Sequence, residues 1–149
     1  GISSIYDSTA RTFFITGVQL EVGQNCTEFE HEPLERTLLK CRRYFTKKVT
    51  GVGFGTLGVG GHIIGGTTAN VVVPLPVEMR SQGTLTSGGS LRLTAPNADT
   101  VTLALAYGST HIPQLTATDS GGFTDGGGNG VVLMGDNDDD AFIAFDAEL

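Results

Sequence analysis

The chain has 149 residues, of which 22 are glycine, and carries a formal net charge of −7 with only 17% charged residues. This acidity argues against nucleic-acid binding, because such binding needs lysine and arginine to neutralise phosphates over a broad face. Hydrophobic residues make up 39% of the chain, which is enough for a packed core, and no apolar run approaches the ~20 residues of a transmembrane helix, so we expect no membrane insertion.

Residues 1–30 form the first predicted part, an N-terminal arm with one strand. Within FFITGVQLEVG, the side chains of Val18, Leu20 and Val22 alternate with polar ones, and a period of two is typical of a half-buried strand. A lone strand is not stable in water. We therefore expect this strand to pair with the C-terminal part, to pair with another chain, or to close a larger upstream domain.

Residues 31–48 form the second part, which we predict to be a helix with Pro33 in its first turn. Its apolar stripe follows helical spacing: Leu34, Leu38, Cys41 and Phe45. A helix this short is marginal alone, so we expect the stripe to pack in an oligomer or against the following sheet, with Cys41 reduced and filling the core. Most of the positive charge would then lie at a solvated helix end: Lys40, Arg42, Arg43, Lys47 and Lys48.

Residues 49–149 form the third part, a predicted all-β domain. Apolar runs alternate with clusters of Gly, Ser, Asn and Asp, and lie at 62–65, 71–77, 91–95, 101–107 and 141–147. This spacing predicts an antiparallel β-sandwich or barrel. Pro74 and Pro76 restrict their run to an edge or a strand end, because proline cannot donate to a ladder.

The succession of ITGVQLEVG, Phe29-Glu30, Pro33 and LLKCRRYF resembles a junction common in bacteriophage tail-fibre and related virion proteins, and the final FDAEL resembles their ends. The resemblance covers residues 13–45, whereas 50–140 match only in style. It implies that Ile15 to Val22 close an upstream jelly roll. It also implies a mainly β, homotrimeric fibre domain of the virion, synthesised in the host cytoplasm, with other tail or fibre proteins as partners and attachment to a host-surface glycan as a role.

The segment from Gly53 to Gly58 matches GxGxxG, the pattern of a dinucleotide-binding turn. Such a turn must lead into a helix, but further glycines follow here, at Gly60, Gly61 and Gly65. We therefore interpret the glycines as sites of close backbone approach, around a threefold axis in a trimer.

The acidic run Asp136–Asp140 resembles the start of a calcium loop. The calcium motif has Gly at its sixth position and Glu at its twelfth, where this chain has Ala141 and Ala147. We interpret the run as an exposed turn, with a metal site completed from elsewhere as the alternative, and predict neither metal nor cofactor. The histidines are scattered, and none has a Ser or Cys nucleophile whose matching geometry can be read from the sequence, so we predict no enzyme. They are His31, His62 and His111.

Two loops, 107–112 and 120–130, combine aromatic and polar residues in a mixture that suits sugar recognition. The candidate receptor or glycan ligands are Tyr107, His111, Phe123 and Asp125. The alternative is that both aromatic rings pack under turns. The sequence hypothesis is thus a fibre C-terminal domain for trimer assembly and host attachment; the alternative is a lectin-like carbohydrate-binding module, and a polysaccharide depolymerase ranks third.

Overall fold

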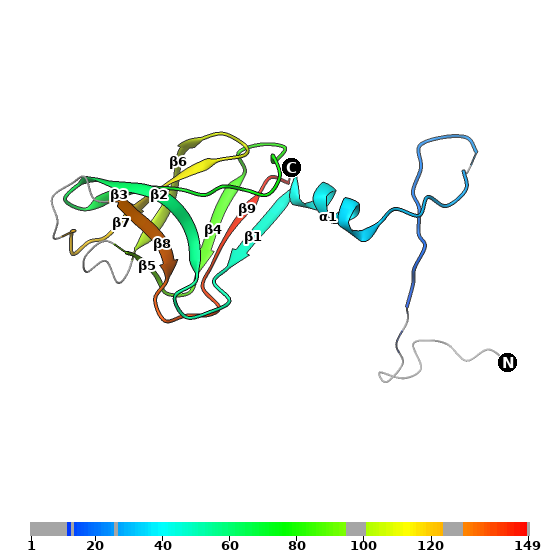
Figure 1. The fold of residues 1–149 in the computed structure, drawn as a ribbon. Coiled ribbons are helices and arrows are strands. Elements are labelled where there is room, and N and C mark those ends of the chain that lie inside the picture. The colour runs from blue at the N-terminus through cyan, green and yellow to red at the C-terminus, as the bar shows by residue number, and fades with distance from the viewer. Residues whose placement is uncertain (1–11, 13, 26, 95–100, 124–129, 149) are drawn as a thin grey trace. The chain divides into compact units, whose positions relative to one another are not determined.

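A computed structural model describes residues 12, 14–25, 27–94, 101–123 and 130–148. The chain divides into two compact units, Gly1–Leu34 and Glu35–Leu149. The second unit holds the nine strands and nearly all of the helix, and its fold is followed in Figure 1. In chain order the elements are α1 (Leu34–Arg42), β1 (Phe45–Val49), β2 (Thr56–Gly65), β3 (Thr68–Val72), β4 (Thr84–Gly88), β5 (Leu91–Leu93), β6 (Thr102–Gly108), β7 (Pro113–Thr118), β8 (Gly130–Gly135) and β9 (Phe142–Asp146).

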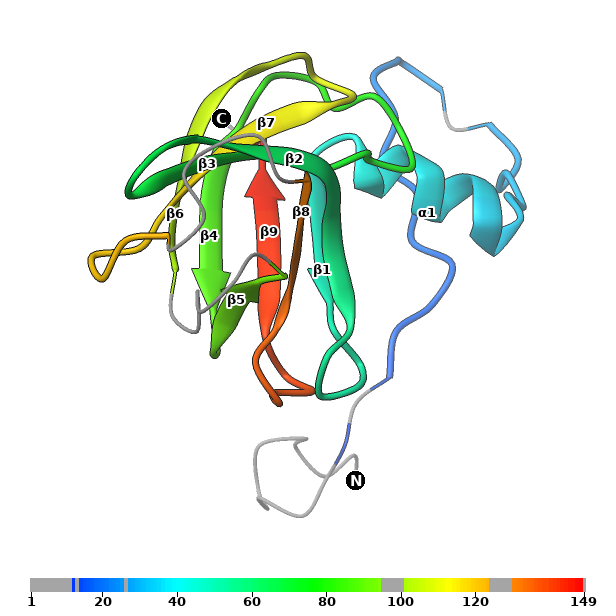
Figure 2. The ribbon, with the colours of Figure 1, turned by 60° about the vertical axis from the view of Figure 1, so that its left-hand side comes forward.

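The strands form two antiparallel sheets, one in the order β1-β9-β4 and the other in the order β5-β8-β2-β3-β7-β6. Figures 1 and 2 show the sheets curling together into a half-barrel. The prediction of a mainly β fold with one short helix and antiparallel sheets is confirmed. The predicted strands at 91–94, 101–105 and 142–145 correspond to β5, β6 and β9.

One hydrophobic core lies between the sheets. The small sheet contributes Ile143 and Phe145, and the large sheet contributes Val71, Leu115 and Leu133, all five of which are fully buried. Alternation places them there, because residues two apart along a strand share one face of the sheet. Val71 and Leu115 lie directly opposite each other across β3 and β7, so their side chains are cross-strand neighbours.

The glycine-rich segment continues directly into β2, so it has no helix with which to build a dinucleotide site. Gly61 shows what its glycines do. A Cβ there would lie 2.3 Å from the Asn70 carbonyl oxygen and 2.6 Å from Val131, on the two neighbouring strands. Close backbone approach is therefore confirmed, and it occurs between strands of one chain. The threefold axis stays a prediction.

The helix is shorter than the predicted 31–48, and Phe45 belongs to β1. Arg43 donates to the Lys40 carbonyl at 3.2 Å and Tyr44 to that of Cys41 at 2.9 Å, so the last turn tightens into bonds three residues apart and ends the helix. The following residues pair with β9, which draws Phe45 out of the helical stripe. Lys47 and Lys48 consequently lie on β1, not at a helix end, and Cys41 is exposed instead of filling the core.

Residues 14–25 pair with no strand in the described part of the chain. The polar side chains of Gln19 and Glu21 instead bond to the returning segment 27–30. The apolar residues of this segment are exposed: Val18 is 70% exposed and Leu20 is 97% exposed. Pairing of this segment within the chain is therefore not observed. The other two alternatives stay predictions.

Candidate assembly and binding surfaces

Helix α1 presents an apolar seam that the described residues leave exposed. Leu34, Leu38 and Cys41 are spaced four and then three residues apart, which is the spacing of the d and a positions of a coiled coil. Leu34 is 81% exposed and Leu38 is 46% exposed, and α1 buries none of its residues. A nine-residue helix without a buried face gains little from propensity alone, so this seam can be stabilised by further helices.

The C-terminal end of α1 is bonded to the β-domain. Thr46 donates its hydroxyl to the Arg42 carbonyl at 2.9 Å, and Arg80 N–H donates to the Arg43 carbonyl at 2.8 Å. Ala147 N–H donates to the Tyr44 carbonyl at 2.7 Å, in line with the β1–β9 pairing. These bonds satisfy carbonyls that a helix end leaves without a partner. They also place the seam next to the beginning of β1.

The β6–β7 connection brings two of the predicted ligand residues together. Tyr107 is 76% exposed and pairs with Gln114, while the exposed His111 lies in the turn between the strands. The Ser109 hydroxyl oxygen accepts N–H bonds from His111 at 3.3 Å and from Ile112 at 3.0 Å, which orders the turn. An exposed aromatic ring beside an ordered polar turn is a suitable platform for stacking on a ligand.

Phe123 lies elsewhere and cannot act as a surface ligand, which corrects its assignment. Its N–H donates to the Gly66 carbonyl at 2.6 Å, and its side chain is only 7% exposed within the core cluster. The alternative reading, in which this ring packs under a turn, is the one that the structure supports. Asp125 lies outside the described residues.

A basic groove of 360 Å³ runs beside β1. Its charged lining consists of Arg42, Lys47 and Lys48, and the remaining lining residues are Thr46, Pro74, Leu75 and Pro76. The Lys48 ammonium donates to the carbonyls of Leu57 at 3.1 Å and Pro74 at 3.3 Å, and burial lowers the pKa of Lys48. The Lys47 ammonium lies 4.0 Å from the centre of the Phe142 ring.

An acidic hollow of 470 Å³ lies over β4 and β9, lined by Thr84, Thr86, Asp146 and Glu148. Thr84 and Asp146 are opposite each other across the two strands, so their side chains share the same face of the sheet. Asp146 accepts the Glu148 N–H at 2.9 Å, which holds this short segment against the end of β9. Neither the basic groove nor the acidic hollow was predicted from the sequence, because each is formed by segments that are far apart in the chain.

The acidic run Asp136–Asp140 is a turn between β8 and β9, in keeping with its sequence interpretation. Asp138 accepts N–H bonds from Ser90 at 2.7 Å and Asp140 at 3.0 Å, and these bonds lower the pKa of its carboxyl group. The Asp136 carboxylate lies 3.2 Å from the Arg92 guanidinium. The described residues contain no group of three or more His, Cys, Asp or Glu arranged to hold a metal ion.

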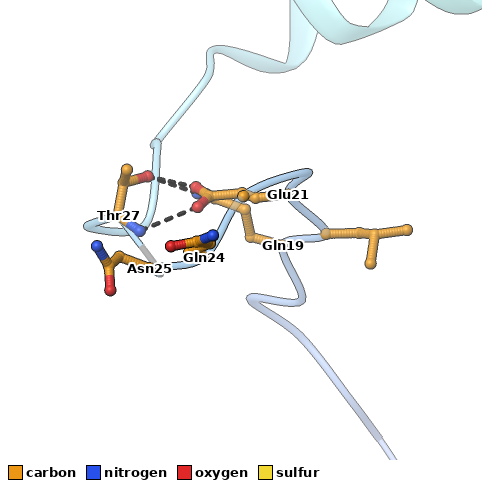
Figure 3. A pocket seen from close by; sticks show the side chains of 7 residues that line it. Gln19, Glu21, Gln24, Asn25 and Thr27 are labelled. Atoms are coloured by element: carbon orange, nitrogen blue, oxygen red, sulfur yellow. Dashed lines mark hydrogen bonds between the residues drawn. The ribbon is translucent and has the colours of Figure 1, made fainter.

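The N-terminal arm encloses a small hollow of 270 Å³, and Figure 3 shows its polar lining. Glu21 accepts a bond from the Thr27 N–H at 2.9 Å and another from the Thr27 hydroxyl. These bonds, together with one from the Gln19 amide, lower the pKa of Glu21. Gln19 also accepts the Glu30 N–H at 2.7 Å, so the loop is closed by side chains instead of by a strand ladder.

Comparison of the chain with models of known protein families, with curated proteins and with solved structures found no match. Across the described ranges, no helix has the length and apolar character required to cross a membrane.

Proposed function

We propose that this chain is the C-terminal domain of a virion fibre, from a bacteriophage tail or a related fibre, and that it assembles as a homotrimer and attaches to a host surface. The observation that carries the proposal is the open seam of α1, in which Leu34 and Leu38 are exposed at coiled-coil spacing. Three parallel helices would cover this seam. The resemblance of the 13–45 junction to tail-fibre proteins supports the same assignment.

The β-domain supports the attachment half of the proposal. It has a closed core of its own and carries Tyr107 and His111 on an exposed connection between two paired strands. Recognition commonly uses loops that are held by a rigid sheet. Three copies on one trimer would raise the avidity for a repetitive surface by roughly 10²–10⁴-fold where the geometry allows simultaneous contact.

The test of assembly is sedimentation of the full chain with Leu38→Asp. A carboxylate in the seam has to be desolvated without a partner, so we expect this variant to sediment as a monomer or to become insoluble. Glu35→Asp, which alters the same helix but keeps its charge, is the control and should remain a trimer. A soluble trimer of Leu38→Asp, indistinguishable from the unsubstituted protein, would contradict this role of the seam.

The exposure of Tyr107 also favours a second candidate, a stand-alone carbohydrate-binding module. Sedimentation separates the two, because a fibre domain should be trimeric and a lectin-like module need not be. Under either hypothesis we expect Tyr107→Ala to reduce adsorption to host cells without changing the melting curve. Normal adsorption would place the receptor site elsewhere, and release of reducing sugar from host polysaccharide would favour a depolymerase instead.

A further inference from the structure

The two charged surfaces of the small sheet are opposite in sign. The order β1-β9-β4 puts the basic groove beside β1 and the acidic hollow over β9 and β4. The groove is lined by three cationic side chains and no carboxylate, and the hollow by two carboxylates and no cation. Each surface therefore lacks, within its own lining, the charge that it would attract.

Within one copy, the Lys47 ammonium does not point toward Asp146. Lys47 directs its ammonium toward Phe142, which lies opposite Val49 on β9, whereas Asp146 lies opposite Phe45. The cation thus points along the strand away from this carboxylate. Lys48 uses two of its three N–H donors on the Leu57 and Pro74 carbonyls, which leaves one donor for a further acceptor.

The backbone of β1 is open on the side of the groove. Ala147 N–H donates to the Tyr44 carbonyl, and Thr50 N–H donates to the Ala141 carbonyl. Because bonded positions alternate in an antiparallel pair, even-numbered residues of β1 bond to β9, and Lys47 turns its peptide groups to the other side. In the described part of the chain β1 pairs with β9 alone, so this edge is available to another segment.

We propose that the acidic end of β9 in one copy, with Asp146 and Glu148, binds the basic groove along β1 of the next copy. This contact joins two different surfaces, so it repeats around a ring and closes when the rotation between copies fits. It rests on the proposed trimer, in which the α1 seam would set the threefold arrangement. Since only two residues lie between α1 and β1, the groove begins next to that seam.

The test uses charge reversal in the full chain, measured by sedimentation equilibrium over a range of protein concentrations. Lys47→Glu and Glu148→Lys should each raise the concentration at which half of the trimer dissociates by about tenfold, because each places like charges at the contact. In the double variant, the concentration at which half of the trimer dissociates should return to within about threefold of the value for the unsubstituted protein. Asp139→Lys, the same charge change in an exposed turn, is the matched control and should have no such effect.

A second measurement identifies the contact directly. A mixture of isotopically light and heavy protein, treated with a zero-length carbodiimide reagent, should yield a light–heavy peptide pair that joins Lys47 to Glu148. A cross-link confined to light–light and heavy–heavy pairs would assign the contact to a single copy and overturn the proposal. So would a double variant that is no more stable as a trimer than the single ones.

The outcomes separate this contact from the proposed function. If the unsubstituted chain is a trimer and neither reversal weakens it, the contact is wrong and the fibre assignment stands. If the unsubstituted chain sediments as a monomer at all concentrations, both the proposed trimer and this contact fail.

Discussion

The residues before Phe45 and those after it differ in how their apolar side chains are buried. The strands that follow Phe45 enclose a common core in which Leu133 and Phe145 are fully buried. The preceding arm and helix carry apolar patterns of comparable regularity, yet Leu20 and Leu34 are mostly exposed. A regular apolar pattern in the sequence thus predicts a face that will be buried, but it does not predict whether the same chain or another one buries it.

This difference has a consequence for how the two regions respond to change. Substitutions after Phe45 act on packing within one copy, so they should appear in unfolding of the isolated chain. Substitutions on the exposed apolar faces before Phe45 act only where another molecule covers them, so they should depend on protein concentration. The four predictions below test this division, from the largest expected effect to the smallest.

The same chemical change in the two regions should give opposite results. Leu133→Ala removes a fully buried side chain and leaves a cavity, and we expect it to lower the free energy of unfolding by about 2–5 kcal/mol. Leu20→Ala removes a side chain that is 97% exposed. It should change the free energy of unfolding by no more than about 0.5 kcal/mol. Urea unfolding followed by circular dichroism measures both. If both variants lose the same free energy of unfolding, the Leu20 side chain must be buried in solution.

Glycines in β2 provide a second matched pair. Gly61→Ala would bring a methyl group to 2.3 Å from the Asn70 carbonyl oxygen, so the neighbouring strands must separate, at a cost of about 1–3 kcal/mol. Gly65→Ala lies on the same strand with no atom within 4 Å of the new methyl group and should be tolerated. Thermal unfolding distinguishes them. Equal melting temperatures would contradict close approach as the reason for glycine at position 61.

The sequence was a good guide where a strand is both apolar and alternating. The segments around Leu91, Leu103 and Ile143 were predicted and are confirmed as strands, and β3 ends at Val72, before Pro74, as the proline rule requires. β4 escaped prediction because its sequence, TLTSG, has one large apolar residue and only a half-buried inner face. β1 overlaps the predicted helix because Phe45 continues the helical spacing, whereas the strand with which β1 pairs, β9, lies at the far end of the chain.

The candidate surfaces were harder to predict than the fold. Tyr107 and Phe123 occur in similar Gly-rich surroundings, but one is 76% exposed and the other 7%. Local composition cannot separate them, because burial depends on which strands close over the loop. The groove beside Lys48 and the hollow beside Asp146 depend on long-range strand pairing, which no local pattern encodes.

The acidic turn should respond to pH through Asp138. Its folded-state pKa is lowered by bonds from Ser90 and Asp140, so its stabilising contribution is fully present above the ordinary value of 3.8 and is lost as the pH falls through the lowered value. Asp138→Asn should therefore lower the melting temperature slightly at pH 7, and the two proteins should converge in strong acid. Chelator should leave both melting temperatures unchanged; a fall of several degrees would instead indicate a bound metal ion.

The smallest effect is expected in the arm, at Glu21. Its folded-state pKa is lowered by the bonds from Thr27 and Gln19, so the closed loop should persist at neutral pH and loosen as the pH falls below the ordinary value of 4.5, through the lowered one. Glu21→Gln should produce the loosened loop at neutral pH. Because no described residue of the arm belongs to the core cluster, the global melting temperature should not change in either case. Hydrogen exchange at the Thr27 amide, which donates to Glu21, measures the loop directly. Gln24→Asn, which shortens another polar side chain of the same hollow without adding a charge, is the control and should leave that exchange rate unaltered. A drop in the global melting temperature with Glu21→Gln would show that the arm and the β-domain unfold as one cooperative unit, and the division at Phe45 would then have to be abandoned.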